Sequence, residues 1–316
     1  MIEKLFCFRS PGNNPHENIA IEEELLYRTE KNACILYLWQ NERSVILGRN
    51  QNAWKECRVE TLSNDGGMLA RRLSGGGAVY HDLGNLNFTF LLRKADYDVK
   101  RQTDVVLNAV RSLGINAERN GRNDITFRGR KFSGNAYYET GDYCYHHGTI
   151  MIAVDDAAMK KYLRPSAAKL KSKGVDSVES RVISLKEEVP SLTAEKTEEA
   201  VLSAFSKEFG NIRPEQIYPE DLDMESLLKR RKKFGSVEWV YGKASGFSDT
   251  FSFRGDRGEF YVELSTERGV IREMYVYSDS MDISLPEKMK NELTGVVYGS
   301  GEMEEILSRY GKSSKI

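Results

Sequence analysis

A triple glycine between charged residues is the feature that most constrains how this chain folds. It lies in residues 71–85, which read Arg-Arg-Leu-Ser-Gly-Gly-Gly-Ala-Val-Tyr-His-Asp-Leu-Gly-Asn and are called the glycine loop below. Adjacent glycines lose much backbone entropy on ordering, so a core element does not normally carry three of them. They suit a backbone that turns sharply or lies against a ligand, where successive N–H groups form an anion site. The loop predicts a phosphate or carboxylate site, and the alternative is a tight turn between strands.

The glycine loop carries neither of the two common nucleotide signatures. A Walker A motif needs a Lys followed by Ser or Thr after the glycines, and none stands there. A GxGxxG fingerprint needs a third glycine where Tyr80 stands. An anion site in this loop is therefore of another type.

Length and composition indicate an ordinary globular protein. The chain has 316 residues, a net charge of −1, 40% hydrophobic and 29% charged residues, which fits one large domain or two unequal ones. The near-neutral charge argues against a general coat for nucleic acid or membrane. Apolar runs such as 35–39 and 88–92 are too short to span a bilayer, and the first residues do not resemble a secretion signal. The four cysteines lack CxxC spacing, so we expect reduced thiols in a cytoplasmic protein.

Hydrophobic periodicity predicts alternating strands and helices over the first 240 residues. We expect strands 34–40 and 44–48 to be joined by the polar turn 41–43, and strand 86–93 to be half-buried, because Leu86, Phe88 and Phe90 alternate with polar residues. The other expected strands are 3–9, 67–72, 125–127 and 145–154, and the expected helices are 16–30, 54–62, 101–113, 155–163, 193–209 and 222–234. Residues 169–181 fit neither period and are expected to form a loop.

The pattern changes after about residue 239. Segments 250–253, 258–265 and 269–277 predict a three-stranded meander, followed by helices 285–293 and 303–310. The glycines and serine of 242–246 are the best linker. We therefore expect a large domain over 1–244 and a small domain over 248–316.

Asn123, Asp124 and Lys131 form a second polar cluster. A strand–turn–strand over 125–132 would carry them toward one end of a hairpin. A carboxylate beside a nucleotide can hold Mg²⁺, and a lysine can neutralise charge that develops on a phosphoryl group. The alternative is an exposed hairpin with ordinary charges.

Two further features, the Cys144/His146 pair and the basic run 229–233, each allow a functional and a purely structural interpretation. Cys144 lies two residues before His146, and a Cys/His pair would allow acyl transfer, although a histidine at the start of a strand is more often structural. No spacing typical of zinc ligands surrounds the histidines at 146–147. The basic run 229–233 is typical of a solvated helix end, and the alternative is docking of an acidic partner or nucleic acid.

These clusters, in this order, resemble the lipoate–protein ligase A family. The glycine loop matches the family's Arg-Arg-x-Ser-Gly-Gly-Gly-Ala-Val-aromatic-His-Asp-x-Gly-Asn signature, and segments 121–124 and 129–136 match the region of its active-site lysine. Further matches are 48–52, 54–57, the block 146–149, the segment 171–182 and the stretch from Glu238 and Trp239 into the C-terminal region. Tyr138 departs from the arginine that some relatives carry.

The resemblance implies a fold, a reaction and partners. The fold would be α+β, with a large mixed-sheet domain related to biotin–protein ligases and class II aminoacyl-tRNA synthetases, and a small α/β domain after it. Lipoate would attack the α-phosphate of ATP with Mg²⁺, releasing pyrophosphate. The lipoyl group of lipoyl-AMP would then pass to a lysine of an apo carrier domain, such as those of 2-oxoacid dehydrogenase E2 subunits or the glycine cleavage H protein. No nucleic acid, membrane or covalent enzyme intermediate is implied.

The resemblance also implies residue roles. Lys131 would be catalytic, bridging the lipoate carboxylate and the α-phosphate, and Asp124 would hold the metal. The implied ATP-binding residues are Arg72, Gly77, Ala78, Val79, Tyr80, Asn85, Asn123, Asp124, Lys131 and Thr149. The implied lipoate-binding residues are Ser74, Gly75, His81, Lys131, His147 and Gly148, with Trp39, Ile46 and Leu73 as candidates for an apolar slot. The loop that closes over the adenylate would include Lys173, Gly174, Val175, Ser177 and Arg181.

Three rival functions remain at the level of sequence. An octanoyltransferase of the same fold would use a cysteine thioester and no ATP. A biotin ligase would activate a different acid. A protein that binds nucleic acid or a partner without catalysis would use the basic run 229–233.

Overall fold

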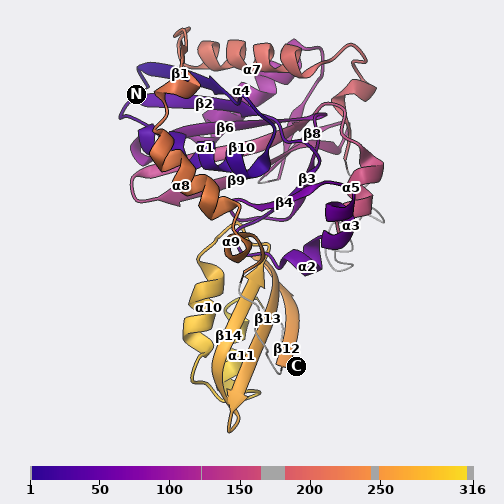
Figure 1. Cartoon of the computed structure of the whole chain (residues 1–316), viewed down its shortest axis with the longest axis vertical. Coiled ribbons are helices and arrows are strands. Elements are labelled where there is room, and N and C mark those ends of the chain that lie inside the picture. Colours follow the sequence, from indigo (N-terminus) through magenta and orange to yellow (C-terminus); the bar gives the residue numbers. More distant parts are fainter. Residues whose placement is uncertain (1, 122, 165–181, 243–248, 312–316) are drawn as a thin grey trace.

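The computed structural model describes residues 2–121, 123–164, 182–242 and 249–311, and it contains three sheets (Figure 1). The largest has eight strands in the order β11-β1-β2-β6-β10-β9-β8-β7. Its strands are β1 (Lys4–Arg9), β2 (Ala33–Trp39), β6 (Asn85–Arg93), β7 (Glu118–Asn120), β8 (Asp124–Phe127), β9 (Arg130–Thr140), β10 (Tyr143–Met151) and β11 (Glu215–Gln216). β1 pairs in parallel with β2 and β11, and the remaining neighbours are antiparallel. The sheet is therefore mixed, as expected from the resemblance.

Helices cover both faces of this sheet. They are α1 (Pro15–Arg28), α4 (Val99–Ser112), α7 (Ala194–Glu208) and α8 (Met224–Phe234). Alternate residues of β2 point to opposite faces: Leu36 packs in the cluster with α4 and α7, whereas Tyr37 packs in the cluster with α1 and α8. Strand β6 lies at the centre, and every residue from Asn85 to Leu92 is buried. The expectation of a half-buried strand at 86–93 was wrong, because helices cover both of its faces.

A second sheet carries the glycine loop. It has the order β4-β3-β5, formed by β3 (Ser44–Leu47), β4 (Met68–Arg71) and β5 (Val79–His81). The predicted strands around 41–43 exist as β2 and β3, but they belong to different sheets and do not pair. The strand β5, which follows the three glycines, was not predicted. The glycine loop therefore leads from one strand of this sheet to another, and its last residue begins β6.

The predicted helices are largely confirmed, with one exception. The expected helix at 54–62 is two short helices, α2 (Ala53–Glu56) and α3 (Val59–Asn64). The break falls at Cys57, whose backbone is extended and which forms a bridge with Leu163 after α5 (Asp156–Tyr162). The other short helices of the described residues are α9 (Val237–Tyr241), η1 (Lys94–Asp96), η3 (Leu185–Glu187) and η4 (Pro219–Asp221). No helix in the described part of the chain is long and apolar enough to cross a bilayer.

The C-terminal part forms its own sheet and core (Figure 1). The predicted meander is confirmed as antiparallel β12 (Asp249–Gly255), β13 (Gly258–Glu267) and β14 (Val270–Ser278). The helices α10 (Leu285–Leu293) and α11 (Gly301–Ser308) pack on it around Phe260, Met289 and Met303. The linker at 242–246 lies outside the described residues except for Gly242, so the boundaries 1–244 and 248–316 stay a prediction.

Candidate active site

A cavity of about 570 Å³ lies where the glycine loop, the β8–β9 hairpin and the C-terminal part meet. Trp39, Ile46 and Val79 supply apolar wall, and Lys131, Asp124 and Thr149 supply polar wall. From the C-terminal part come Arg254, Asp256, Arg257, Gly258, Asp279, Ser280, Met281 and Asp282. The cavity thus joins a charged region to an apolar one, which suits an amphiphilic ligand.

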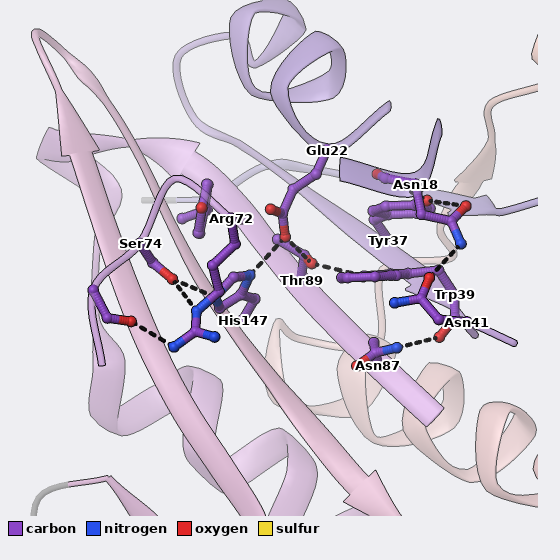
Figure 2. A network of polar contacts seen from close by, with 12 residues as sticks. Asn18, Glu22, Tyr37, Trp39, Asn41, Arg72, Ser74, Asn87, Thr89 and His147 are labelled. Carbon is purple, nitrogen blue, oxygen red and sulfur yellow. Dashed lines mark hydrogen bonds and ion pairs between the residues drawn. The ribbon is translucent and has the colours of Figure 1, made fainter. Parts of the chain in front are cut away.

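Arg72 holds the glycine loop in shape. Its guanidinium donates to Ser74 Oγ (3.0 Å), as Figure 2 shows. It also donates to the carbonyl oxygens of Gly75 (2.7 Å), Gly77 (2.8 Å) and Ile46 (3.1 Å). Burial lowers the pKa of Arg72 to about 10, so it stays charged at neutral pH. Because the carbonyl oxygens of Gly75 and Gly77 point toward this cation, the N–H groups of the loop point away from it. One of them, the N–H of Gly76, donates to the Ser280 carbonyl (3.0 Å).

The neighbouring Arg71 braces the chain rather than facing a ligand. It donates to the carbonyl oxygens of Gly48, Gln51 and Val240 at 2.7–3.0 Å, and burial lowers its pKa to about 10. Arg71 does not line the cavity, unlike Arg72. Of the two cations that made the loop resemble an anion site, one is therefore structural.

Lys131 and Asp124 form an ion pair in the cavity. Lys131 Nζ lies 2.6 Å from Asp124 Oδ1, and about a quarter of each side chain is exposed. Strands β8 and β9 bring them together, with Asp124 opposite Gly134. A Cβ on Gly134 would lie 2.6 Å from Lys131 Nζ, so the glycine leaves room for the lysine. Both side chains line the cavity, so a ligand there can contact the pair while the hairpin keeps its shape.

A buried polar relay adjoins the cavity, because its members Trp39, Arg72 and His147 also line it, and Figure 2 shows its contacts. The Glu22 carboxylate, fully buried on α1, accepts from His147 Nδ1 (2.8 Å), and His147 Nε2 lies in hydrogen-bond contact with the Ser74 hydroxyl (2.8 Å). Ser74 Oγ in turn accepts from Arg72. Glu22 also accepts from the Thr89 hydroxyl (2.8 Å), whose oxygen accepts from Trp39 Nε1 (3.1 Å). The relay connects a buried carboxylate to the buried Arg72 through the side chains of His147 and Ser74.

The structure brings most of the sequence-predicted site residues to this cavity. Those that line it are Arg72, Gly77, Ala78, Val79, His81, Asn123, Asp124, Lys131, His147, Gly148 and Thr149. Five do not line it: Leu73, Ser74, Gly75, Tyr80 and Asn85. Leu73 is instead buried in the core cluster that also contains Trp39 and Ile46. Ser74 is buried behind the wall, Gly75 lies against the Ser280 carbonyl, Tyr80 packs on Tyr162, and Asn85 donates to Asn87. Lys173, Gly174, Val175, Ser177 and Arg181 lie outside the described residues.

Sequence reasoning missed two parts of the site. Glu22 was hidden in an amphipathic helix among other glutamates, and because Glu23 and Glu24 are buried too, only its contacts with His147 and Thr89 distinguish it. The C-terminal residues were missed because the meander was considered a separate unit. The signal that could have found them is the charged turn Arg254-Gly255-Asp256-Arg257-Gly258, where two arginines flank a tight connection.

The structure weakens two of the rival functions. The Cys144 thiol is buried and donates to the Leu92 carbonyl, and burial raises its pKa to about 12. Both ring nitrogens of His146 bond to other side chains, those of Gln102 and Asn135, so His146 is not a base for that thiol. The basic run pairs with acids: Arg230 and Lys233 contact Glu23, and Lys229 contacts Glu225.

The residues present fit a magnesium ion that arrives with a nucleotide. Among the described residues, no three His, Cys, Asp or Glu side chains are grouped as a metal site. Mg²⁺ commonly binds through one or two carboxylates together with substrate phosphates, and Asp124 supplies such a carboxylate on the cavity wall.

Family models and solved structures agree on what this chain is similar to. Residues 14–206 match the lipoyl protein ligase A/B catalytic domain, and residues 245–315 match the bacterial lipoate protein ligase C-terminus. The structure of LipL1 from P. falciparum, in complex with lipoate, is 29% identical with a TM-score of 0.83, covering 96% of this chain and 94% of that one.

Two further solved structures match only part of this chain. A bipartite lipoate protein ligase from Thermoplasma acidophilum, described with its E2 lipoyl domain, is 27% identical with a TM-score of 0.66, covering 78% of this chain and 98% of that one. A lipoate-protein ligase A bound with ATP is 27% identical with a TM-score of 0.64, covering 77% and 99%.

Proposed function

Because this chain belongs to the lipoyl protein ligase A/B family and is a ligase, we propose that it activates lipoate with ATP and transfers the lipoyl group to a lysine of a carrier domain. The observation that carries the proposal is the Lys131–Asp124 pair beside the glycine loop, in a cavity that also has an apolar wall. Such a site offers a place for phosphates and a place for an acyl chain. The ligands named for the solved structures, lipoate and ATP, agree with this division.

In the first step, a lipoate carboxylate oxygen forms a bond to the α-phosphorus of ATP, and the bond to the β-phosphate oxygen breaks. Pyrophosphate leaves, and a mixed anhydride, lipoyl-AMP, remains. Negative charge is concentrated around phosphorus, so a fixed cation there lowers the barrier. Lys131 would supply this cation, and Thr149 and the N–H groups of Gly77 and Ala78 would orient the phosphate. Asp124 would hold Mg²⁺, which neutralises phosphate charge when bound.

In the second step, the ε-amine of a carrier lysine attacks the anhydride carbonyl. An amide bond forms, the bond to the phosphate oxygen breaks, AMP leaves and the amine releases its proton. Lys131 would remain at the carbonyl and stabilise the oxyanion. The apo carrier domains of 2-oxoacid dehydrogenase E2 subunits and the glycine cleavage H protein are the proposed acceptors. We also place the reaction in the cytoplasm, which fits the four free, buried cysteines.

A lipoylation assay tests the proposal. The purified full chain, ATP, Mg²⁺, lipoate and an apo carrier domain are expected to give lipoylated carrier and pyrophosphate. Lys131→Ala is expected to lower the rate of pyrophosphate release about 100-fold or more, because it removes the cation at the reacting phosphorus.

Lys94→Ala is the matched control, since Lys94 also pairs with a carboxylate of the hairpin strand β9, Glu139 at 2.8 Å, but does not line the cavity. That variant should keep the rate within about twofold. Lipoylation without ATP, or activity lost in Cys144→Ser and kept in Lys131→Ala, would contradict the proposal in favour of the thioester route. Pyrophosphate release driven by biotin instead of lipoate would indicate a biotin ligase.

A further inference from the structure

The imidazole of His81 carries a polar atom that has no partner. His81 is 3% exposed and lines the cavity together with Trp39, Ile46 and Val79. Its Nε2 is buried and accepts or donates no hydrogen bond within the described residues. Buried polar atoms are nearly always paired, so an unpaired one on a cavity wall indicates a ligand that completes it.

The hydrogen-bond pattern around His81 fixes which nitrogen carries the proton. Asn18 Nδ2 donates to the backbone carbonyl of Gln40 (2.8 Å), which can only accept, so the orientation of the Asn18 amide is determined. The same nitrogen donates to Asn41 Oδ1 (2.9 Å), as Figure 2 shows, and this orients the Asn41 amide. Asn41 Nδ2 therefore faces His81 Nδ1 (3.0 Å) and donates to it.

Because Nδ1 accepts, the neutral imidazole of His81 holds its proton on Nε2. Burial, together with the nearby Arg72 and His147, lowers the pKa of His81 to about 3, so the ring is neutral at physiological pH. The unpaired Nε2 atom is thus a donor. Its role is fixed by the series of hydrogen bonds that runs from the Gln40 carbonyl through Asn18 and Asn41 to His81 Nδ1.

The polar groups beside His81 are already paired. Trp39 Nε1 donates to Thr89, both nitrogens of His147 are bonded, and the Asn87 amide donates to the Trp39 carbonyl (3.2 Å). Among the described residues that line the cavity, His81 Nε2 is the buried side-chain nitrogen or oxygen without a partner. A ligand that fills this region therefore meets hydrocarbon and one N–H group.

This region is well placed for the far end of an acyl chain. In the eight-stranded sheet, β2, which carries Trp39, is separated from β9, which begins beside Lys131, by β6 and β10. Three strand spacings amount to roughly 14 Å. An acid whose carboxylate reaches Lys131 thus directs its tail toward Trp39 and His81.

Resting on the proposed function, we propose that the Nε2–H group of His81 makes this enzyme select an acid that carries sulfur at the end of its chain, lipoate, over the saturated acid of the same chain length, octanoate. A ring sulfur of lipoate is a weak acceptor and can take this N–H. The hydrocarbon tail of octanoate covers the N–H without replacing the water it displaces. A buried donor left unpaired carries a desolvation penalty. Binding of octanoate incurs this penalty and binding of lipoate does not, so the enzyme is expected to disfavour octanoate.

The test compares kcat/KM for lipoate and for octanoate, measured as ATP-dependent pyrophosphate release by the full chain. The wild-type chain is expected to favour lipoate. His81→Phe keeps a flat ring and removes the N–H, and the lipoate-to-octanoate ratio should fall about fivefold. His81→Gln keeps an amide N–H near the same position and should restore part of the ratio. Thermal melting of each variant separates a packing defect from a change in selectivity.

A second measurement does not depend on activity. A long-range ¹H–¹⁵N spectrum of the wild-type chain should show His81 protonated on Nε2 at pH 7, with Nδ1 as an acceptor, and the Nε2 signal should shift on adding lipoate but much less on adding octanoate.

The outcomes separate this inference from the proposed function. A ratio that is unchanged in His81→Phe, a wild-type preference for octanoate, or a proton on Nδ1 would overturn the role of His81 while both acids are still activated. If neither acid drives pyrophosphate release, the proposed function itself fails.

Discussion

At the scale of single residues, the site includes a buried carboxylate that does not line the cavity. Glu22 is fully buried, and its Oε1 accepts from both His147 and Thr89, whereas Oε2 has no partner in the described part of the chain. Glu22 is connected to the oppositely charged Arg72 by the hydrogen bonds of the relay. Buried charges are tolerated when an opposite charge and hydrogen bonds compensate for lost hydration. The glycine loop is therefore connected, through Ser74 and His147, to a carboxylate from a different element, α1.

Glu22→Gln tests this dependence. Replacing Oε2 with an amide nitrogen buries an unpaired donor and removes the charge opposite Arg72. We expect the free energy of unfolding, measured by urea denaturation, to fall by about 2 kcal/mol. Glu17→Gln on the same helix is the control. Glu17 contacts Arg231 at 3.4 Å and is partly exposed, so its loss should change stability by less than about 0.5 kcal/mol. Equal effects of the two variants would show that the relay does not stabilise the protein.

The residues themselves also decide how much of the site was predictable. Lys131 and Asp124 were found from sequence because a turn between short strands brings them together, and this is local geometry. Glu22 was not found, because its role depends on the packing of α1 against β6 and β10, and no spacing within α1 reveals which glutamate contacts those strands. His81 was predicted in the lipoate site, but its tautomer follows from Asn18 and Asn41, far away in sequence.

At the scale of elements, the glycine loop requires glycine for two reasons: a backbone conformation with positive φ, and the close approach of another backbone segment. Gly76 has a φ of +88°, a conformation that favours glycine. Gly48, at the end of β3, has ordinary φ, yet a Cβ there would lie 2.0 Å from the carbonyl oxygen of Gly76. The missing Cβ of Gly48 thus lets two backbone segments approach closely, and a side chain at residue 48 would push the loop away.

Gly48→Ala is expected to displace the glycine loop, because the clash is with backbone atoms that cannot rotate away. Stability should fall by about 1–3 kcal/mol, and the KM for ATP should rise. The measurements are urea denaturation and the ATP dependence of pyrophosphate release. Gly301→Ala, at the start of α11, provides the control: a Cβ at this glycine would meet no described atom within 4 Å, and the change should be neutral or slightly stabilising. An unaltered KM in Gly48→Ala would mean that ATP does not bind to this loop.

Elements were predicted well where one periodicity dominates and poorly where tertiary contacts decide. The amphipathic helix α4 and the meander β12–β14 follow from local patterns. The pairing of β3 with β4 and β5 does not, because β3 follows β2 by a short polar turn that is typical of a hairpin. Strand β5 comes directly after three glycines, where local preference predicts a loop, and only pairing with β3 makes it a strand.

At the scale of the whole molecule, the cavity belongs to both parts of the chain. The connection between β12 and β13 and the segment 279–282 line it, and the Ser280 carbonyl accepts from the N–H of Gly76 in the glycine loop. Asn50 adds a second link, since its side chain donates to the Ile283 carbonyl (2.8 Å) and its carbonyl accepts from Ser278. Arg254 and Arg257 therefore add two cations to a cavity that already holds Arg72 and Lys131.

This placement predicts that Arg257 acts in one half-reaction more than in the other. In the proposed reaction, the pyrophosphate that leaves in the first step carries most of the negative charge of ATP, whereas the transfer step involves a single phosphate. A cation on the C-terminal wall is therefore expected to act mainly in the first step. Arg257→Ala should lower ATP-dependent pyrophosphate release about tenfold. Transfer from preformed lipoyl-AMP to a carrier domain should change less than about twofold. Arg272→Ala is the matched control, because Arg272 lies on β14, pairs with Glu267 at 3.4 Å and does not line the cavity. Equal losses in both half-reactions would instead point to a general role of Arg257 in holding the C-terminal part, where its guanidinium donates to the Arg309 carbonyl (3.1 Å).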